Sequence, residues 1–194
     1  MTTLTASVSL PTQLALVKEE LLYARDRARR VCKGLDAGTW AARPLPGQWA
    51  IGECLTHLNI TSERFIPLID DAIREGRARG VEGNGPYGKG LIGWALQRFL
   101  EPPYKMKIKT PPPFLPVTVE SMADTLERFD YLQQEVQVRI DRSAGLALDR
   151  LRMVSPFNAR VKYNLYATFC VIAAHQRRHL WQAEQVRAKL QVAE

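Results

Sequence analysis

The sequence predicts an all-α fold, a four-helix bundle with one long crossover, on three observations. Four segments repeat apolar residues every three or four positions, which places those residues on one face of a helix. No segment alternates apolar and polar residues as a half-exposed strand does. A long stretch rich in glycine and proline separates the second helical segment from the third. With 194 residues, 46% of them hydrophobic, the chain has the size of one domain, residues 1–194, with a self-sufficient core.

The first predicted helix carries an apolar stripe between residues 14 and 35. Pro11 suits its first turn, and Gly34 lies near its end. The charged residues of this segment fall off the stripe, as they do on a helix with one buried face. The stripe consists of Leu14, Val17, Leu21, Ala24, Ala28, Val31 and Leu35.

The second predicted helix follows a turn-rich connection at residues 38–49, which contains Pro44, Pro46 and Gly47. The glycines from Gly76 onward predict its end. One position of its inner face is a histidine. The stripe consists of Ala50, Cys54, His57, Thr61, Phe65, Leu68 and Ala72.

Residues 76–118 are predicted to form an insertion between the second and third helices. The insertion includes a short helix, Leu91 to Leu100, followed by the proline-rich pieces EPPY and TPPPFLP. A structureless loop of this length is uncommon inside a compact domain. A bundle whose second and third helices run in the same direction requires a long crossover, and this segment can supply it.

The third predicted helix begins at Thr118, which can act as its N-cap, and ends near Gly145. Gln133 is the one polar interruption of its inner stripe. The last helix is predicted from about Val161 to Leu190, with no strand before it. The third stripe consists of Met122, Leu126, Phe129, Val136 and Ile140, and the fourth of Leu165, Phe169, Ile172, His175, His179, Gln182, Val186 and Leu190.

All three histidines of the chain fall on these stripes and are predicted to point inward. His175 and His179 are four residues apart, so both imidazoles project from one face of a helix and can bind one metal ion. His57, on a facing helix, would complete a three-histidine site that leaves a coordination position for water or substrate. The alternative, for any one histidine alone, is a hydrogen-bonded core residue or a solvated pair. Three unpaired imidazoles in one apolar bundle would be costly, which favours the metal.

Two motifs of other metalloenzymes are absent. His175 is followed by Gln176 and Arg177, so the HExxH motif of the zincin metalloproteases is missing. No Glu-x-x-His pair occurs on two helices, so a mononuclear site is favoured over a di-iron site. Glu53, one turn before His57, is the candidate catalytic base or hydrogen-bond partner of that histidine. Its alternative is a solvated first-turn glutamate, which the helix dipole favours.

Two stretches resemble the signature sequences of the DinB-like (DNA-damage-inducible) superfamily: PLPGQWAIGECLTHL in the second helix and AAHQRRHLWQAEQVR in the fourth. The resemblance spans most of the chain. It implies a four-helix bundle that binds a divalent metal through His57, His175 and His179, and it implies a homodimer. Members of the superfamily include thiol-dependent S-transferases and isomerases, and metal-dependent hydrolases. They often carry serine where this chain has Ala50.

Three neutral imidazoles leave a bound ion most of its positive charge. Such an ion can lower the pKa of water toward about 7 or bind a thiol as thiolate, so hydrolysis and thiol transfer are both open. We expect zinc, with nickel, iron and manganese as alternatives. The resemblance adds a low-molecular-weight thiol as a second cofactor. We therefore expect an S-transferase or a hydrolase that acts on a small molecule, and the nearest carboxylate of the fourth helix, Glu184, is too distant to favour the hydrolase.

The formal charge of +7 is concentrated in the crossover, because residues 72–110 contain 8 basic and 3 acidic side chains, a surplus of +5. This segment could be a lid that attracts an acidic thiol or a solvated loop. The alternative function is a non-catalytic, metal-containing module that uses the segment to contact an anionic partner. No nucleic-acid motif is present, so we expect no nucleic-acid partner. The lid residues are Lys89, Arg98, Lys105, Lys107 and Lys109, with Tyr87, Trp94, Phe99 and Tyr104.

The remaining expectations concern location and assembly. The sequence begins without a recognisable secretory signal and has no run of roughly 18 to 20 apolar residues, so we expect a cytoplasmic protein without a membrane partner. Three cysteines without a CxxC pair predict reduced thiols, and Cys54 is interpreted as a small core residue. The homodimer would use apolar residues of the crossover. They are Trp94, Phe99, Phe114 and Leu115.

Overall fold

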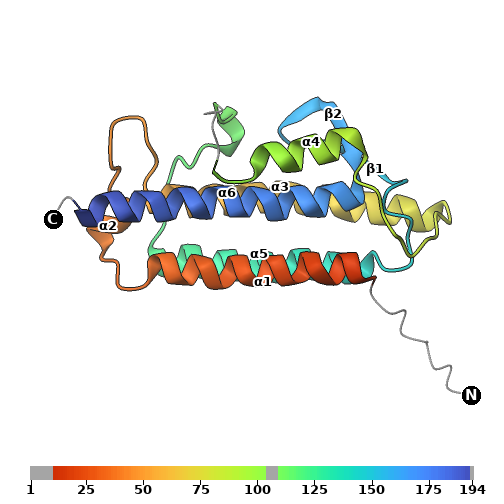
Figure 1. The fold of residues 1–194 in the computed structure, drawn as a ribbon, viewed down its shortest axis with the longest axis horizontal. Coiled ribbons are helices and arrows are strands. Elements are labelled where there is room, and N and C mark those ends of the chain that lie inside the picture. Colours follow the sequence, from red (N-terminus) through yellow and green to blue (C-terminus); the bar gives the residue numbers. More distant parts are fainter. Residues whose placement is uncertain (1–10, 104–108, 193–194) are drawn as a thin grey trace, which may run out of the picture.

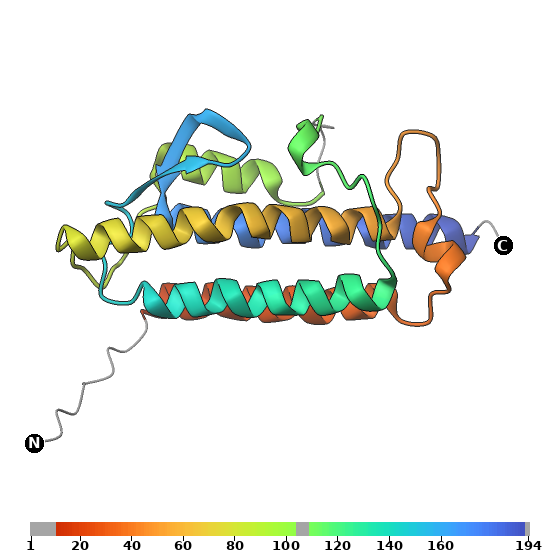
Figure 2. The same cartoon turned by 180° about the vertical axis from the view of Figure 1, so that it is seen from behind.

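Four long helices form a bundle in the computed structural model, which describes residues 11–103 and 109–192 (Figure 1). They are α1 (Thr12–Cys32), α3 (Ile51–Ala78), α5 (Met122–Arg142) and α6 (Leu165–Val192). α1 and α3 each pack against both α5 and α6, so the four helices close a ring. α3 and α5 run in the same direction, opposite to α1 and α6 (Figures 1 and 2). The predicted all-α bundle, with a crossover between its second and third long helices, is confirmed.

Two layers and an outer cover make up the molecule. α1 and α5 form one layer, and α3 and α6 form the other (Figures 1 and 2). The crossover and a β-hairpin lie outside the α3/α6 layer. Each long helix forms because its apolar stripe is buried against the other helices, as Leu21, Phe65 and Phe129 illustrate at 0–1% exposure.

The crossover contains the predicted short helix, α4 (Gly90–Leu100), which packs along α6. The contact is close because Gly93 has no side chain: a Cβ there would meet the Ala167 Cβ at 2.4 Å. A 3-10 turn, η1 (Pro112–Phe114), follows and contacts α3. Within the described residues, α4 and η1 therefore lie along the α3/α6 layer, whereas residues 81–87 bond to Gln13 of α1 and to Gly145 and Ala147 after α5, at one end of the bundle.

A short helix that the sequence did not predict interrupts the connection between α1 and α3. α2 (Ala37–Ala41) is capped by Asp36, whose side chain accepts a hydrogen bond from the Thr39 N–H at 2.7 Å. The indole of Trp40 is buried and donates to the Glu120 carbonyl at 3.1 Å. This hydrogen bond joins the α1–α3 connection to the segment that precedes α5.

The prediction that no strand precedes the last helix is wrong. β1 (Arg152–Ser155) and β2 (Asn158–Asn164) form an antiparallel hairpin, so the last helix begins at Leu165 and not at Val161. The Asn164 side chain stops the helix from extending further back, because its oxygen accepts the Ala167 N–H at 2.8 Å as an N-cap does. The hairpin was missed because its strands are short and only β1 alternates in burial.

Two predicted boundaries also differ from the structure. Ser121 and not Thr118 caps α5, accepting the Asp124 N–H at 3.2 Å. α3 continues through Gly76 to Ala78. Gly76 is there for packing, because a Cβ at this position would meet Leu151 Cδ1 at 2.7 Å.

The crossover residues expected at the surface divide into two groups. Trp94, Phe99 and Leu115 are exposed, whereas Phe114 and Tyr87 are buried, which corrects their assignment to the dimer surface and the lid. The predicted lid residues Tyr104, Lys105 and Lys107 lie outside the described residues. The homodimer stays a prediction.

Among the residues that the structure describes, none of the helices combines the length and the apolar character that spanning a bilayer requires.

Candidate metal centre

The three histidines, distant in sequence, meet at one point between α3 and α6. His57 comes from α3, and His175 and His179 come from α6. One ring nitrogen from each lies within 4.8 Å of the other two. The Nε2 atoms of His57 and His175 are 3.3 Å apart. All three side chains are buried, at 2% to 8% exposure.

Hydrogen bonds at the far side of two rings fix which nitrogen faces the cluster. The Nδ1–H of His57 donates to the Phe114 carbonyl at 2.8 Å, and the Nδ1–H of His179 donates to the Gln182 amide oxygen at 3.1 Å. Both acceptors are oxygens, so the proton of each neutral ring is on Nδ1. The Nε2 atoms of these two rings therefore carry lone pairs. This arrangement is usual for metal-binding histidines.

The spacing fits a divalent ion. Imidazole nitrogen binds zinc at about 2.0–2.1 Å, so two ligands of a tetrahedral ion are about 3.3–3.4 Å apart. The Nε2 separation of 3.3 Å between His57 and His175 falls at this value. This separation also allows a His175 Nε2–H to donate to His57 Nε2 when no ion is bound, whereas a bound ion would take a lone pair from each nitrogen. The buried three-histidine cluster could therefore bind a metal.

The electrostatic surroundings keep the imidazoles neutral. Burial lowers the pKa of His57 to about 4, although its hydrogen bond to Phe114 acts in the opposite direction. Burial also lowers the pKa values of His175 and His179 well below the usual range, and the positive charge of Arg178 contributes to both. Neutral imidazole is the form that binds metal, so protons compete weakly for these nitrogens near neutral pH.

Two aromatic rings from connecting segments lie beside the cluster, and a third packs on one of them. The Trp49 ring centroid lies 5.0 Å from His57 and 5.7 Å from His179. Phe157, in the hairpin turn, lies 5.6 Å from His175 and 4.4 Å from Phe114. Sequence reasoning did not find these rings. Trp49 follows the turn that contains Pro44 and Pro46, and Phe114 lies within the piece TPPPFLP. No spacing rule connects such residues to a helix face.

Glu53, the candidate base, is occupied elsewhere. Its carboxylate is 5% exposed, which contradicts the solvated alternative. It accepts the Nε–H of Arg43 at 2.8 Å, pairs with a second guanidinium nitrogen of Arg43, and accepts the Ala50 N–H at 2.8 Å. These contacts stabilise the first turn of α3 and do not involve the histidines. No carboxylate belongs to the histidine cluster among the described residues.

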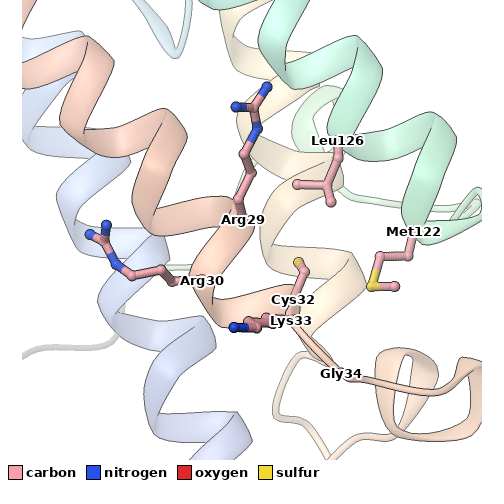
Figure 3. Close-up of a pocket in the computed structure, with 7 residues that line it drawn as sticks. All are labelled: Arg29, Arg30, Cys32, Lys33, Gly34, Met122 and Leu126. Atoms are coloured by element: carbon pink, nitrogen blue, oxygen red, sulfur yellow. The ribbon is translucent and has the colours of Figure 1, made fainter.

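Cys54 and a nearby hollow do not contribute ligands. Cys54 is fully buried, and burial raises the pKa of its thiol, so it is a core residue as predicted. A shallow hollow at the end of α1, shown in Figure 3, is bordered by Arg29, Arg30 and Lys33 over an apolar floor that includes Met122. None of the three histidines lines it.

The comparisons with known proteins agree with this geometry. The sequence matches the DinB superfamily over residues 20–183, which includes all three histidines. No curated protein and no solved structure matches the chain. Since the match covers most of the chain, the protein belongs to the DinB superfamily.

Proposed function

We propose that the protein is a metal-dependent enzyme that transfers a low-molecular-weight thiol to an electrophilic small molecule, using one divalent ion held by His57, His175 and His179. Zinc suits three imidazoles best, and nickel, iron or manganese can replace it. The ion, when bound, would favour the thiolate form of a thiol and could also lower the pKa of water.

The observation that carries this proposal is that, among the residues that the structure describes, no carboxylate belongs to the cluster of three neutral imidazoles. A hydrolase needs a group that removes a proton from water. Glu53, the nearest candidate in sequence, already accepts hydrogen bonds from Arg43 and Ala50. In thiol transfer the sulfur is itself the nucleophile: the S–C bond forms with a sulfur lone pair, the leaving group departs with its bonding pair, and the thiol proton goes to solvent.

Other residues of the site support an anionic nucleophile and an apolar acceptor. Arg178 is 6% exposed, and its charge acts on His175 and His179, so the field at the cluster favours an anion. Trp49 and Phe157 place apolar rings beside the histidines, against which an apolar acceptor could pack. The Phe114 carbonyl and Gln182 hold two imidazoles in the required orientation.

Metal analysis of protein purified without an affinity tag tests the site. We expect one divalent ion per chain, and loss of stoichiometric binding in His57→Ala, His175→Ala and His179→Ala, because a three-ligand site has no spare protein donor. Full occupancy in any of these variants would remove that residue from the ligand set.

A turnover screen of the metal-loaded protein tests the reaction. Product that forms only when a bacterial low-molecular-weight thiol and an electrophile are both present supports thiol transfer, whereas acceptor cleavage without thiol supports the hydrolase. Glu53→Gln is the matched variant: a general base contributes about 100-fold or more, so a loss of that size at full metal content would assign Glu53 as a base and contradict the proposal. No turnover at full metal content would favour a non-catalytic module.

A further inference from the structure

The exposed side of α4 is largely apolar. Leu91, Ile92 and Trp94 are 80%, 48% and 57% exposed. Trp94 follows Leu91 by three residues and the exposed Arg98 follows Trp94 by four, so these three share one side of the helix. The opposite side packs along α6, where Gly93 allows a close approach. Large apolar side chains grouped on an exposed surface mark a contact with another molecule.

The β-hairpin presents cations on the same side of the molecule. Side chains alternate along a strand, and Met153 and Tyr163 are turned inward, at 5% and 2% exposure. Arg152, Arg160 and Lys162 are exposed. The hairpin and α4 both pack on the α3/α6 layer, so their exposed sides both turn away from it (Figures 1 and 2). Together they form one outer face, which consists of Leu91, Ile92, Trp94, Arg98, Arg152, Val154, Arg160 and Lys162.

Direct contacts hold the two parts of the outer face together. β2 packs against α4. The side-chain nitrogen of Asn164, at the end of β2, donates to the Gly88 carbonyl just before α4 at 2.9 Å. The oxygen of the same side chain accepts the Ala167 N–H of α6. The outer face is therefore preformed, and its apolar and basic side chains stand on elements that are joined to each other and to the bundle.

The outer face carries only positive charge. α4, β1 and β2 contain four basic residues and no aspartate or glutamate. The ion pairs of the described residues use other side chains, such as Arg177 with Glu101, and leave these four cations unpaired. Basic side chains beside exposed aliphatic and tryptophan side chains are typical of helices that lie on the surface of an anionic bilayer. The four cations are Arg98, Arg152, Arg160 and Lys162.

We propose that the outer face docks the protein on the surface of a bilayer that contains anionic lipid. Leu91, Ile92 and Trp94 would enter the boundary between headgroups and acyl chains, and the four cations would lie among the anionic headgroups. The expectation of no membrane partner rested on the absence of a spanning segment, which a peripheral contact does not require. The inference does not depend on the proposed thiol transfer, because docking needs no turnover.

Two other partners fit the outer face less well. A second copy of the chain would bring four cations against the same four cations in an isologous contact. A nucleic acid would attract the cations, since basic side chains bind phosphates, but it would leave the aliphatic side chains of Leu91 and Ile92 without a function. An anionic bilayer is the partner that uses both the charge and the apolar side chains.

Flotation of full-length, metal-loaded protein with lipid vesicles tests the inference. We expect binding to phosphatidylcholine vesicles with about 30% phosphatidylserine, little binding to phosphatidylcholine alone, and weaker binding at about 0.5 M salt. Tryptophan emission should shift to shorter wavelength on binding, because Trp94 leaves water. Trp94→Phe should still bind but lose this shift. Absence of binding to the anionic vesicles would overturn the inference, and so would an unchanged shift in Trp94→Phe.

Matched variants separate the apolar contribution from the charge. Ile92→Gln and Lys162→Gln alter exposed side chains, so folding should be retained, and each should weaken vesicle binding about fivefold. The controls make the same kinds of change in the α1/α5 layer. Val138→Gln replaces a valine of α5 that is 47% exposed, and Lys33→Gln, directly after α1, removes the same charge. Both should change binding less than about twofold. Equal losses in test and control variants would overturn the inference.

Two further measurements assign the outer face if the bilayer is the wrong partner. Duplex DNA that binds as tightly as the anionic vesicles, without loss in Ile92→Gln, would overturn the inference in favour of a nucleic acid. A dimeric mass by light scattering that Trp94→Gln converts to a monomeric mass, in a protein that does not float with vesicles, would overturn it in favour of a second copy.

Discussion

The orientation of two of the three histidines depends on residues that are not ligands themselves. Phe114 holds His57 through a backbone carbonyl, and Gln182 holds His179 from the next turn of α6. A carbonyl from the crossover therefore takes part in a site formed by the two helices of one layer. This dependence explains why η1 packs against α3 in the middle of an otherwise irregular segment.

At the start of α3, a half-formed capping box leads to a stability prediction. Glu53 accepts the Ala50 N–H, but Ala50 has no side chain to accept the Glu53 N–H in return. Ala50 already has the extended backbone of an N-cap, with φ −71° and ψ 167°. Ala50→Ser should therefore raise the free energy of unfolding by about 1 kcal/mol, measured by urea denaturation.

Metal content is the control for this substitution. It should not change, because Ala50→Ser alters no ligand. A lower free energy of unfolding in Ala50→Ser would mean that a hydroxyl cannot be accommodated at this buried position, where the alanine is 1% exposed.

The histidines could be predicted from sequence, and their surroundings could not. Spacing alone places His175 and His179 on one face of a helix, and His57 lies on the stripe of a helix that must face another. Trp49 and Phe157 reach the site from loops, whose path depends on the packing of the whole chain. For Glu53, the sequence predicted its position in the first turn of the helix. It could not predict its partner, because Arg43 lies in the preceding connection.

At the scale of elements, α1, α3 and α5 were predicted well because one apolar face determines each of them, whereas α6 is buried on all sides from Leu165 to Gln176. The hairpin was not predicted, because the seven residues of β2 show little alternation between buried and exposed positions. Val161 and Tyr163 suit a helix extended backward from Leu165 as well as they suit a strand. The Asn164 cap decides between the two, and a lone asparagine is a weak signal in sequence.

The crossover helix α4 is attached to α6 by an ion pair, which leads to a pH prediction. Glu101, directly after α4, accepts the Nε–H of Arg177 at 2.9 Å and pairs with a second nitrogen of that guanidinium. Burial raises the pKa of Glu101, but the hydrogen bonds and charge of Arg177 outweigh it, so the pKa lies below its usual value. A depressed carboxyl pKa gives stability above the unfolded value, about 4.3, and this stability is lost as pH falls through the folded pKa.

Glu101→Gln should therefore destabilise the protein by about 1 kcal/mol at pH 7 and by progressively less below about pH 4. Urea denaturation at both pH values measures the difference. Glu75→Gln is the control, because Glu75 forms an exposed pair with Arg79 one turn away and should cost about 0.5 kcal/mol or less at pH 7. An equal effect of Glu101→Gln at pH 7 and pH 3 would contradict the role of the ion pair.

Across the whole molecule, the core consists of two apolar clusters with polar residues between them. In every long helix the boundary falls near the middle, between Leu58 and Phe65 of α3 and between Phe129 and Val136 of α5. Several buried polar side chains occupy these boundaries. Among those with uncharged side chains that the candidate metal centre does not use are Ser62, Gln133 and Gln176, at 0% to 3% exposure.

The two glutamines of this layer are costly for stability. Neither amide atom of Gln133 or Gln176 has a hydrogen-bond partner within the described structure. An unpaired buried polar group costs about 1–3 kcal/mol relative to an apolar group of similar shape. The interruption of the apolar stripe at Gln133 therefore marks a layer that costs the bundle stability.

Gln133→Leu should raise the free energy of unfolding by about 1 kcal/mol or more, because leucine joins the two apolar clusters and removes the unpaired amide. Urea denaturation measures the change. Gln134→Leu is the matched control: it makes the same substitution at the adjacent, exposed position and should change stability by less than about 0.5 kcal/mol. If Gln133→Leu were the less stable of the two, the amide would have to be hydrogen-bonded in the folded protein, and the layer would stabilise the bundle through those bonds.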